Sequence, residues 1–382
     1  IVGASGTVGS AVSELLAKDH QVIRVGHSRG DATVDMTDGA SIATLFAGIG
    51  RFDALVVASG SVAFNALTEM TDEQWQVGLQ SKLMGQINLT RAAIAHLSDR
   101  GSITLISGIL SEEPINWGAS ATTINGNVVH YELIGEAKAK NLIVFSNGLG
   151  TDFRIWLPLF DELGDDVSVL FYDSRGHGLS GGADKPFGMA DLVSDLASLC
   201  DELGIRKATF CGLSVGGLVC QGLWQERPDL FRKLILCDTA PRIGSAEIWA
   251  ERIAGIEKGG IESAADNAMA RWFTPAFHED RADELAGYRL MMTRQSLSGY
   301  LSTCAALRDT DFSDVLPTVT VPTLFVVGDQ DGSTPPATVE AGSQLVPGAR
   351  FEVIDDCAHI PSVEQPEALA ELIQGFMRKQ AN

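Results

Sequence analysis

Short strand-like runs alternate with amphipathic helical runs along most of the chain, and this alternation limits the possible fold more than any other feature. Strand–helix–strand units pack into a parallel sheet that carries helices on both faces. In the first series we expect, in chain order, a helix at 8–18, a strand at 21–25, a helix at 40–47, a strand at 54–58, a helix at 72–97 and a strand at 102–107. The first part of the chain is therefore predicted to be a partial parallel sheet.

The pattern changes between residues 110 and 126, where prolines, glycines and asparagines interrupt any sustained period. The dipeptide Asn125-Gly126 is followed by alternating apolar residues, which is typical of a β-hairpin. We expect this hairpin to open a second domain. The predicted domains are therefore residues 1–122 and residues 123–382.

A second α/β series follows the hairpin. Its buried strands are expected at 142–146, 167–172, 208–211, 234–237, 323–327 and 350–354. Between about 242 and 312 the strand pattern stops, and helical segments rich in alanine, arginine and tryptophan replace it. We therefore predict a mainly parallel sheet with a helical cap inserted between two of its late strands.

Composition and charge exclude several classes of protein. The 382 residues are 45% hydrophobic and 20% charged, which is usual for folded chains. The formal net charge is −21. Because such a surface repels phosphate backbones and anionic lipids, we expect no nucleic-acid partner and no membrane-surface binding. No apolar run reaches the roughly 18–20 residues that a membrane-spanning helix needs.

The cysteines indicate a reducing compartment. None of the six forms a C-x-x-C pair, and several lie in apolar runs. Free buried thiols are therefore expected rather than a disulfide framework, and we predict a cytoplasmic protein. The first residue, Ile1, is not methionine and already lies in a strand-like run, so we expect the native chain to begin earlier, with a lost targeting segment left open.

A nucleophile motif stands near the middle of the second series. Gly212-Leu213-Ser214-Val215-Gly216 follows the apolar run at 208–211 and precedes a helix-like stretch. The pentapeptide G-x-S-x-G between a strand and a helix is typical of a nucleophile elbow, a tight turn whose glycines leave room for neighbouring backbone. The pentapeptide alone also occurs by chance, but its setting favours Ser214 as a nucleophile.

A serine hydroxyl is a weak nucleophile near neutral pH and needs a base that an acid orients. Asp331 follows the strand expected at 323–327, and His359 follows the strand expected at 350–354. Both residues should lie at the carboxyl edge of the parallel sheet, where sites in open α/β folds form. The order serine, aspartate, histidine is the order that this architecture uses. Asp329 is the alternative acid, and we favour Asp331.

Two backbone amides are expected to stabilise the negative charge on the substrate's carbonyl oxygen. One is the amide of Val215, directly after the serine. The other is the amide of Leu149, in the loop at 146–150 that follows an early strand. The alternative for this loop is a simple tight turn. A further loop at 173–178 is expected to support the elbow.

These motifs resemble the α/β-hydrolase family, and the resemblance extends over about 260 residues, from roughly 123 to 382. Within this family the chain is similar to the 3-oxoadipate enol-lactonases. The segments that carry this narrower likeness are 146–152 with Trp156, 172–180, 271–275, 299–309, 328–336 and 357–361. The elbow and its partners indicate only a hydrolase, whereas the segments in the helical cap narrow the substrate. Gly148 is a small departure, because a serine is expected there.

The resemblance implies hydrolysis of a carboxymethyl-substituted enol-lactone through a serine acyl-enzyme, in the β-ketoadipate route of aromatic catabolism. It implies no cofactor and no metal. Because the substrate is a small anion and the chain is acidic, a cation is expected near the serine, and a guanidinium binds a carboxylate at two points. The candidates in the cap are Arg271, Arg289, Arg294 and Arg308. Trp156 and Trp272 are expected to line the pocket or to belong to the core.

A glycine motif opens the chain. Its spacing, G-x-x-G-x-x-G between a strand and a helix, lets the backbone approach a pyrophosphate at the helix N-terminus. An arginine just past the second strand would favour a 2′-phosphate. The expected nucleotide-site residues are Gly3, Gly6, Gly9, Arg29 and Asp35. Together these features resemble the short-chain dehydrogenase/reductase family, with its Rossmann-like fold, over residues 1 to about 122.

The catalytic pair of that family is missing. Ser107 fits the family's strand-end serine, but Ser120 and Ile124 stand where its tyrosine and lysine belong. We therefore interpret residues 1–122 as a truncated, inactive segment that retains at most residual NAD(P) binding. Three alternatives remain open. One is a general carboxylesterase or another hydrolase with the same triad, and the second is an NAD(P)-binding oxidoreductase fused to a hydrolase. The third is a nucleotide-responsive sensor with an inactive hydrolase domain. The sequence leaves the oligomeric state unknown.

Overall fold

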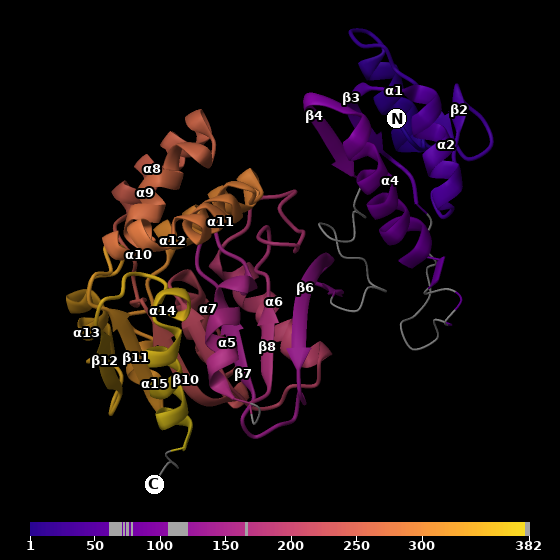
Figure 1. Ribbon diagram of the computed structural model, residues 1–382. Helices are drawn as coiled ribbons and strands as arrows, with labels where there is room; N and C mark the ends of the chain where they lie inside the picture. Colours follow the sequence, from indigo (N-terminus) through magenta and orange to yellow (C-terminus); the bar gives the residue numbers. More distant parts are fainter. Residues whose placement is uncertain are drawn as a thin grey trace. The chain divides into compact units, whose positions relative to one another are not determined.

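Figure 1 shows the computed structural model of the chain, which describes residues 1–60, 71, 73, 76–77, 79–105, 121–164 and 167–378. The described chain divides into two compact units, one within residues 1–105 and the other within residues 121–378. Each unit has its own cluster of buried hydrophobic side chains. The described chain therefore has two hydrophobic cores rather than one.

In the first unit, short strands pair in parallel around the N-terminal segment. Strand β1 (Val25–Gly26) pairs with β2 (Ala32–Thr33), and β3 (Phe52–Val57) pairs with β4 (Leu97–Leu105). Val2 forms parallel bridges to both β1 and β3. The helical elements are α1 (Thr7–Leu16), α2 (Gly39–Ile49), η2 (Leu79–Met84), α4 (Gly85–Ala93) and η3 (Ile94–His96). The expected N-terminal parallel strands are thus confirmed.

Two strands of this unit differ from the sequence-based expectation. The strand expected at 21–25 is reduced to β1, because the carbonyl of Arg24 accepts hydrogen bonds from the amides of Asp31 and Ala32 in a turn. Strand β4 begins at Leu97 rather than at Ser102, because pairing with β3 brings Leu97 opposite Phe52. Pairing between distant segments thus decides where β1 and β4 begin. The local pattern of apolar residues does not show which segments pair.

The second unit contains one eight-stranded sheet in the order β12-β11-β10-β9-β7-β8-β6-β5. The strands are β5 (Ala121–Ile124), β6 (Asn127–Ile134), β7 (Ile143–Ser146), β8 (Val169–Tyr172), β9 (Ala208–Leu213), β10 (Phe231–Cys237), β11 (Thr323–Gly328) and β12 (Arg350–Ile354). β5 and β6 form an antiparallel hairpin, β6 runs antiparallel to β8, and the other neighbours are parallel. The expected hairpin and all six expected strands are confirmed.

Local chemistry explains the hairpin and the central strands. Asn125 and Gly126 have φ values of 50° and 82°, the left-handed pair that a two-residue hairpin turn needs. Every residue of β7, β8, β9 and β11 is buried. Helices cover both faces of a parallel sheet, so its strands are nearly continuous apolar runs, and such runs are recognisable in the sequence.

Helices flank this sheet on either side of the strands. They are α5 (Leu157–Leu163), α6 (Met189–Glu202), α7 (Val215–Glu226), α13 (Pro336–Ser343), α14 (Pro361–Glu364) and α15 (Pro366–Arg378). Helix α5 packs against α15, and α6 packs against α7 (Figure 1). All six cysteines lie in this unit, and all are buried free thiols. Among the described residues, no helix is both long and apolar enough to cross a membrane.

In the chain, a group of helices follows β10 and precedes β11, and these helices gather at one end of the sheet (Figure 1). They are α8 (Ala246–Gly259), α9 (Glu262–Trp272), α10 (Pro275–Asp280), α11 (Ala282–Thr293) and α12 (Leu297–Asp309). Ser245, Thr274 and Ser296 cap α8, α10 and α12 by accepting a hydrogen bond from a first-turn amide. These side chains explain where the helices begin. Helix α8 packs against both α9 and α12, which closes the cap over the end of the sheet.

Candidate active site

Ser214 forms the entire turn between β9 and α7. Its φ of 55° and ψ of −119° lie outside the usual regions for an L-residue, at a cost of about 1–3 kcal/mol. The amide of Ser214 donates to the carbonyl of Cys237 at 3.0 Å, and its own carbonyl accepts from Thr239 Oγ1 at 2.7 Å. A side chain at Gly216 would collide with the carbonyls of Ser146 and Asn147. The turn therefore requires the small residues that the sequence places around the serine.

His359 and Asp331 form a hydrogen-bonded pair at the carboxyl edge of the sheet. The imidazole Nδ1 lies 2.8 Å from Asp331 Oδ2, and both side chains are buried. Asp331 also accepts from the amides of Ser333 and Thr334 at 2.7 and 3.1 Å and from Thr334 Oγ1 at 2.6 Å. When Nδ1 donates to the carboxylate, Nε2 is left as the proton acceptor.

The pKa of Asp331 reflects opposing effects. Burial alone would raise this pKa, but the charge of His359 and the hydrogen bonds from His359, Thr334 and Ser333 outweigh burial and lower it. Asp331 is therefore held as a carboxylate. Asp329, the alternative acid, accepts from the backbone amide of Cys357 at 3.0 Å and so ties the two loops together. Of the two aspartates, Asp331 is the one that contacts the imidazole.

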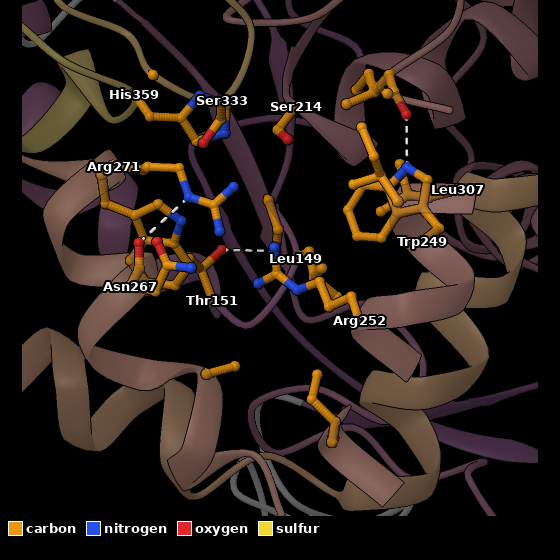
Figure 2. Close-up of a pocket in the computed structure, with 18 of the residues that line it drawn as sticks. Leu149, Thr151, Ser214, Trp249, Arg252, Asn267, Arg271, Leu307, Ser333 and His359 are labelled. Carbon is orange, nitrogen blue, oxygen red and sulfur yellow. Dashed lines mark hydrogen bonds between the residues drawn. The ribbon is translucent and has the colours of Figure 1, made fainter. Parts of the chain in front are cut away.

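Ser214 and His359 face the same cavity, which has a volume of about 570 Å³ (Figure 2). They come from loops more than a hundred residues apart in the sequence and are only 8% and 5% exposed. Between these two described side chains the structure contains no hydrogen bond. Catalytic hydrogen bonds are often long before substrate binds, so this geometry is compatible with a nucleophile–base pair.

The two expected oxyanion amides lie beside this cavity. Leu149 lines it together with Gly148, and Val215 is the first residue of α7, where an amide has no partner within the helix. The loop that carries Leu149 is held by Thr151, whose Oγ1 donates to the carbonyl of Gly148 at 2.8 Å. Leu149 therefore shares the cavity with Ser214, and Val215 directly follows the serine, whereas the oxyanion role of their amides stays a prediction.

The two candidate tryptophans have different places. Trp272 lines the cavity, and its carbonyl accepts the backbone amide of His359 at 3.1 Å. Trp156 is fully buried in the core, where its indole packs 4.8 Å from the ring of Phe145 and its Nε1 donates to Asn147 Oδ1 at 2.9 Å. Trp156 as a pocket residue is therefore wrong, whereas its core alternative describes it.

Of the four candidate arginines, only Arg271 lines the cavity. Arg289 faces α9, where it pairs with Glu262 at 2.6 Å and with Asp266 at 2.8 Å. Arg308 pairs with its neighbour Asp309 at 2.8 Å, and Arg294 is exposed at the end of α11. Arg289, Arg294 and Arg308 as cavity residues are wrong, because the rotation of their helices turns them away from the serine.

Arg252 on α8 is a second cavity arginine that the sequence reasoning missed. One of its terminal nitrogens donates to the hydroxyl of Tyr300 at 2.6 Å, and its guanidinium lies over the ring of Trp249. Figure 2 shows that Arg252 and Arg271 both direct their guanidinium groups into the cavity. The only available signal was Trp249 one helical turn before Arg252, which by itself does not indicate a binding residue.

Both arginines carry charge that the described chain does not neutralise by an ion pair. Neither has a carboxylate oxygen within 4.0 Å among the described residues, and the one acid among the cavity residues, Glu251, is exposed. Burial, followed by repulsion from Arg252, lowers the pKa of Arg271. The Nε of Arg252 is buried without a partner. The cavity is therefore suited to an anionic ligand.

Asp238 is the other residue that the sequence reasoning missed. It directly follows β10 and is completely buried. Its side chain, that of Asp331 and that of His359 each offer an atom within 4.8 Å of the others. Such a cluster can hold a metal ion, but all four partners of Asp331 donate an N–H or O–H. We therefore describe the cluster as a hydrogen-bond network.

The glycine motif of the first unit forms a tight turn before α1. Gly3 has a φ of 86°, the amide of Gly6 donates to the carbonyl of Gly3 at 3.0 Å, and a side chain at Gly9 would collide with that carbonyl. Arg29 is exposed, and Asp35 accepts from the amide and hydroxyl of Thr37. Nucleotide binding here stays a prediction.

The three residues at the catalytic positions of the reductase family do not lie in the described part of the first unit. Ser107 and Ser120 lie outside the described residues. Ile124 is buried in β5 of the second unit. A side chain at that position therefore belongs to the hydrolase hairpin, and the first unit does not use it as a lysine equivalent.

The fold and the site define the class of protein. A family model described as the alpha/beta hydrolase family matches residues 143–372, which is more than half of the chain. This chain belongs to the α/β-hydrolase family and is a hydrolase that acts on ester or lactone bonds.

Particular relatives narrow this class. The chain is 34% identical to 3-oxoadipate enol-lactonase 2 of Acinetobacter baylyi over 251 residues, which cover 66% of this chain and 93% of that protein. It is 29% identical to RutD of Rhizobium rhizogenes, a provisionally assigned carbamate hydrolase, over 65% of this chain and 98% of that protein. The crystal structure of the enol-lactonase from Burkholderia xenovorans LB400 superposes with a TM-score of 0.65 at 35% identity, covering 68% of this chain and all of that one.

Proposed function

We propose that this protein hydrolyses a small carboxylate-bearing enol-lactone, of the 3-oxoadipate enol-lactone type, through an acyl-enzyme on Ser214. One observation carries the proposal. Two arginines, Arg252 and Arg271, face the cavity of Ser214 and His359, and neither has an acidic partner among the described residues. The enol-lactonases among the relatives support the same substrate class. The reaction belongs to the β-ketoadipate route of aromatic catabolism, and we place it in the cytoplasm.

In the first half of the proposed reaction, Ser214 Oγ attacks the lactone carbonyl while Nε2 of His359 takes the hydroxyl proton. Asp331 holds the imidazole in this tautomer and stabilises its positive charge. The amides of Val215 and Leu149 stabilise the oxyanion, and one such donor typically lowers the barrier by about 3 kcal/mol. The ring C–O bond then breaks, the enolate leaves, and the proton from His359 completes an enol that becomes a ketone.

In the second half, water replaces the departed group. His359 takes a proton from this water, whose oxygen forms a bond to the acyl carbon, and the bond to Ser214 Oγ breaks as the serine regains a proton. The product is an open-chain keto acid with one new carboxylate. No cofactor takes part in this scheme, because proton transfers and one nucleophile account for every bond.

Arg252 and Arg271 are proposed to hold the carboxylate of the substrate's arm. The protein's net charge of −21 repels an anion at long range, so binding needs a local positive potential. A guanidinium in a partly buried cavity supplies it, because the low dielectric strengthens each charged hydrogen bond. The Trp249 and Tyr300 rings hold the Arg252 guanidinium in place through cation–π contacts of 5.4 and 5.9 Å.

Steady-state kinetics on the enol-lactone and on its neutral methyl ester test this assignment. Changing Arg252 or Arg271 to glutamine removes a charged hydrogen bond worth about 1.5–3 kcal/mol, so we expect kcat/KM for the acid to fall about tenfold to a hundredfold. The ester, which lacks the charge, should lose less than threefold. Arg289→Gln is the matched control, because this arginine lies on the cap but pairs with acids outside the cavity.

The same assay separates the alternatives. If the wild-type protein hydrolyses simple aryl esters and not the enol-lactone, it is a general carboxylesterase. Turnover of a carbamate in place of the lactone would favour the activity assigned to RutD. Loss of all hydrolysis in Ser214→Ala is expected under each of these, and retained hydrolysis in that variant would exclude the serine mechanism.

The first unit is proposed to have no catalytic role and at most residual affinity for NAD(P). The tight glycine turn before α1 supports this affinity, since it brings backbone amides to a helix N-terminus. The alternative of a working oxidoreductase fused to a hydrolase requires turnover of a reduced dinucleotide by the intact chain.

A further inference from the structure

Asp238 is a buried acid for which the mechanism above has no use. It stands at the end of β10, beside the strand that precedes Asp331, with a left-handed φ of 48° and a relative exposure of 0%. Its Oδ1 accepts a hydrogen bond from the amide of Gly328 at 3.0 Å, whereas its Oδ2 is buried and has no hydrogen-bond donor among the described residues. A buried carboxylate oxygen without a donor is costly, so this atom needs an explanation.

The neighbouring groups decide its protonation. Asp331 and His359 lie within 4.8 Å, and the thiols of Cys237 and Cys357 are the other titratable groups that act on Asp238. Asp331 is already held as a carboxylate by four donors. Two adjacent buried carboxyl groups cannot both be ionised, so the proton belongs on the one without donors. Burial, followed by the charge of Asp331, raises the pKa of Asp238 well above its ordinary value.

We propose that Asp238 is protonated in the folded protein and donates its O–H from Oδ2 to the carboxylate of Asp331, and thereby acts as a positioning residue for the catalytic acid. The protonated carboxyl satisfies its own unpaired oxygen and gives Asp331 one more donor. It also limits the negative charge behind His359 to one unit. A second negative charge would favour the protonated imidazole, which cannot act as a base.

The protonation half of this inference does not depend on the proposed function. In the intact protein, infrared difference spectroscopy between wild type and Asp238→Asn should show the carbonyl stretch of a protonated carboxyl at neutral pH in the wild type only. The exposed acid Asp329 provides the control, because Asp329→Asn should leave that band unchanged. Absence of the band from the wild type would overturn the proposal.

Stability against pH gives a second readout. A carboxyl whose pKa is raised by folding binds a proton that the unfolded chain releases, so wild-type stability should fall as pH rises above the ordinary pKa of aspartate. Asp238→Asn removes this proton binding. The difference between the melting temperature of this variant and that of the wild type should therefore increase, in favour of the variant, from pH 4 to pH 8. A difference in melting temperature that stays constant or decreases as pH rises would contradict the inference.

The positioning half rests on the proposed function and is read from kinetics. Asp238→Ala removes the donor, and we expect kcat to fall about tenfold with little change in KM. Asparagine keeps an N–H donor, so Asp238→Asn should recover most of this loss and keep the acid limb of the kcat/KM profile where the wild type has it. If the asparagine variant shifts that limb by one pH unit or more, Asp238 was charged. If the alanine variant loses nothing while the infrared band is present, the proton is there but positions nothing.

Discussion

Single residues carry the chemistry of this site, and they differ in how far the sequence reveals them. Ser214, Asp331 and His359 are visible because each lies at the end of a strand of recognisable pattern or in the loop that follows it. Arg252 is not, since the choice between it and Arg289 depends on the rotation of two cap helices. Asp238 directly follows β10, at the same edge of the sheet as the loop that carries Asp331, so its position in the sequence could have indicated it. What the sequence lacks in each case is the identity of the neighbouring side chains.

At this scale we predict the effect of Asp331→Asn. Folding lowers the pKa of Asp331, so its carboxylate stabilises the fold above the pKa of the unfolded chain, and this stabilisation is lost as pH falls through the folded pKa. The variant should therefore be less stable than wild type at pH 7, and the two melting temperatures should converge as the pH falls below the ordinary pKa of aspartate. It should also lose about 10³–10⁴-fold in kcat, because asparagine favours the wrong imidazole tautomer.

A control variant separates this effect from a general loss of charge. Asp329→Asn changes the neighbouring acid, which bonds a backbone amide and not the imidazole. Its kcat should fall far less than that of Asp331→Asn. Equal losses in the two variants would mean that Asp331 has no special role.

At the scale of elements, buried parallel strands were the most predictable part of the fold and short strands the least. β7, β8, β9 and β11 are buried throughout because both faces of the sheet are covered, so their mainly apolar runs are recognisable in the sequence. β1 and β4 depend on which strand they pair with, and a local pattern does not contain that information. The cap helices were expected as a group, whereas their packing against α8 was not accessible from the sequence.

One contact joins the cap to the catalytic loop. Glu364 on α14 accepts from the amide and hydroxyl of Thr274 at the start of α10, and its other oxygen accepts the amide of Ala358 at 2.8 Å, next to His359. Glu364→Gln replaces one acceptor by a donor that faces an N–H. We expect a loss of about 1–3 kcal/mol in the free energy of unfolding, measured by urea denaturation, and a reduced kcat.

The exposed Glu371 on α15 is a suitable comparison for that variant. Glu371→Gln removes the same charge from the second unit without touching the histidine loop. Its unfolding free energy and kcat should stay close to those of the wild type. If both variants behave alike, the bridge between α10 and the loop does not hold the histidine.

At the scale of the whole molecule, the two separate hydrophobic cores predict that each unit can fold without the other. The proposed catalytic residues, the cavity and the cap all lie in the second unit. A chain that begins at residue 120 should therefore fold, as measured by circular dichroism. On the enol-lactone it should retain the kcat/KM of the intact protein within about threefold. A folded but inactive shortened chain would show that the first unit contributes to the site.

The distribution of thiols gives the intact protein a built-in reporter. Every cysteine is buried in the second unit, and burial raises the pKa of five of the six, with Cys200 and Cys304 at about 12. Only an exposed thiolate reacts rapidly with an alkylating reagent. The rate of labelling by iodoacetamide should therefore report the unfolding of the second unit alone. Unfolding of this unit can thus be followed in the intact protein without an engineered probe.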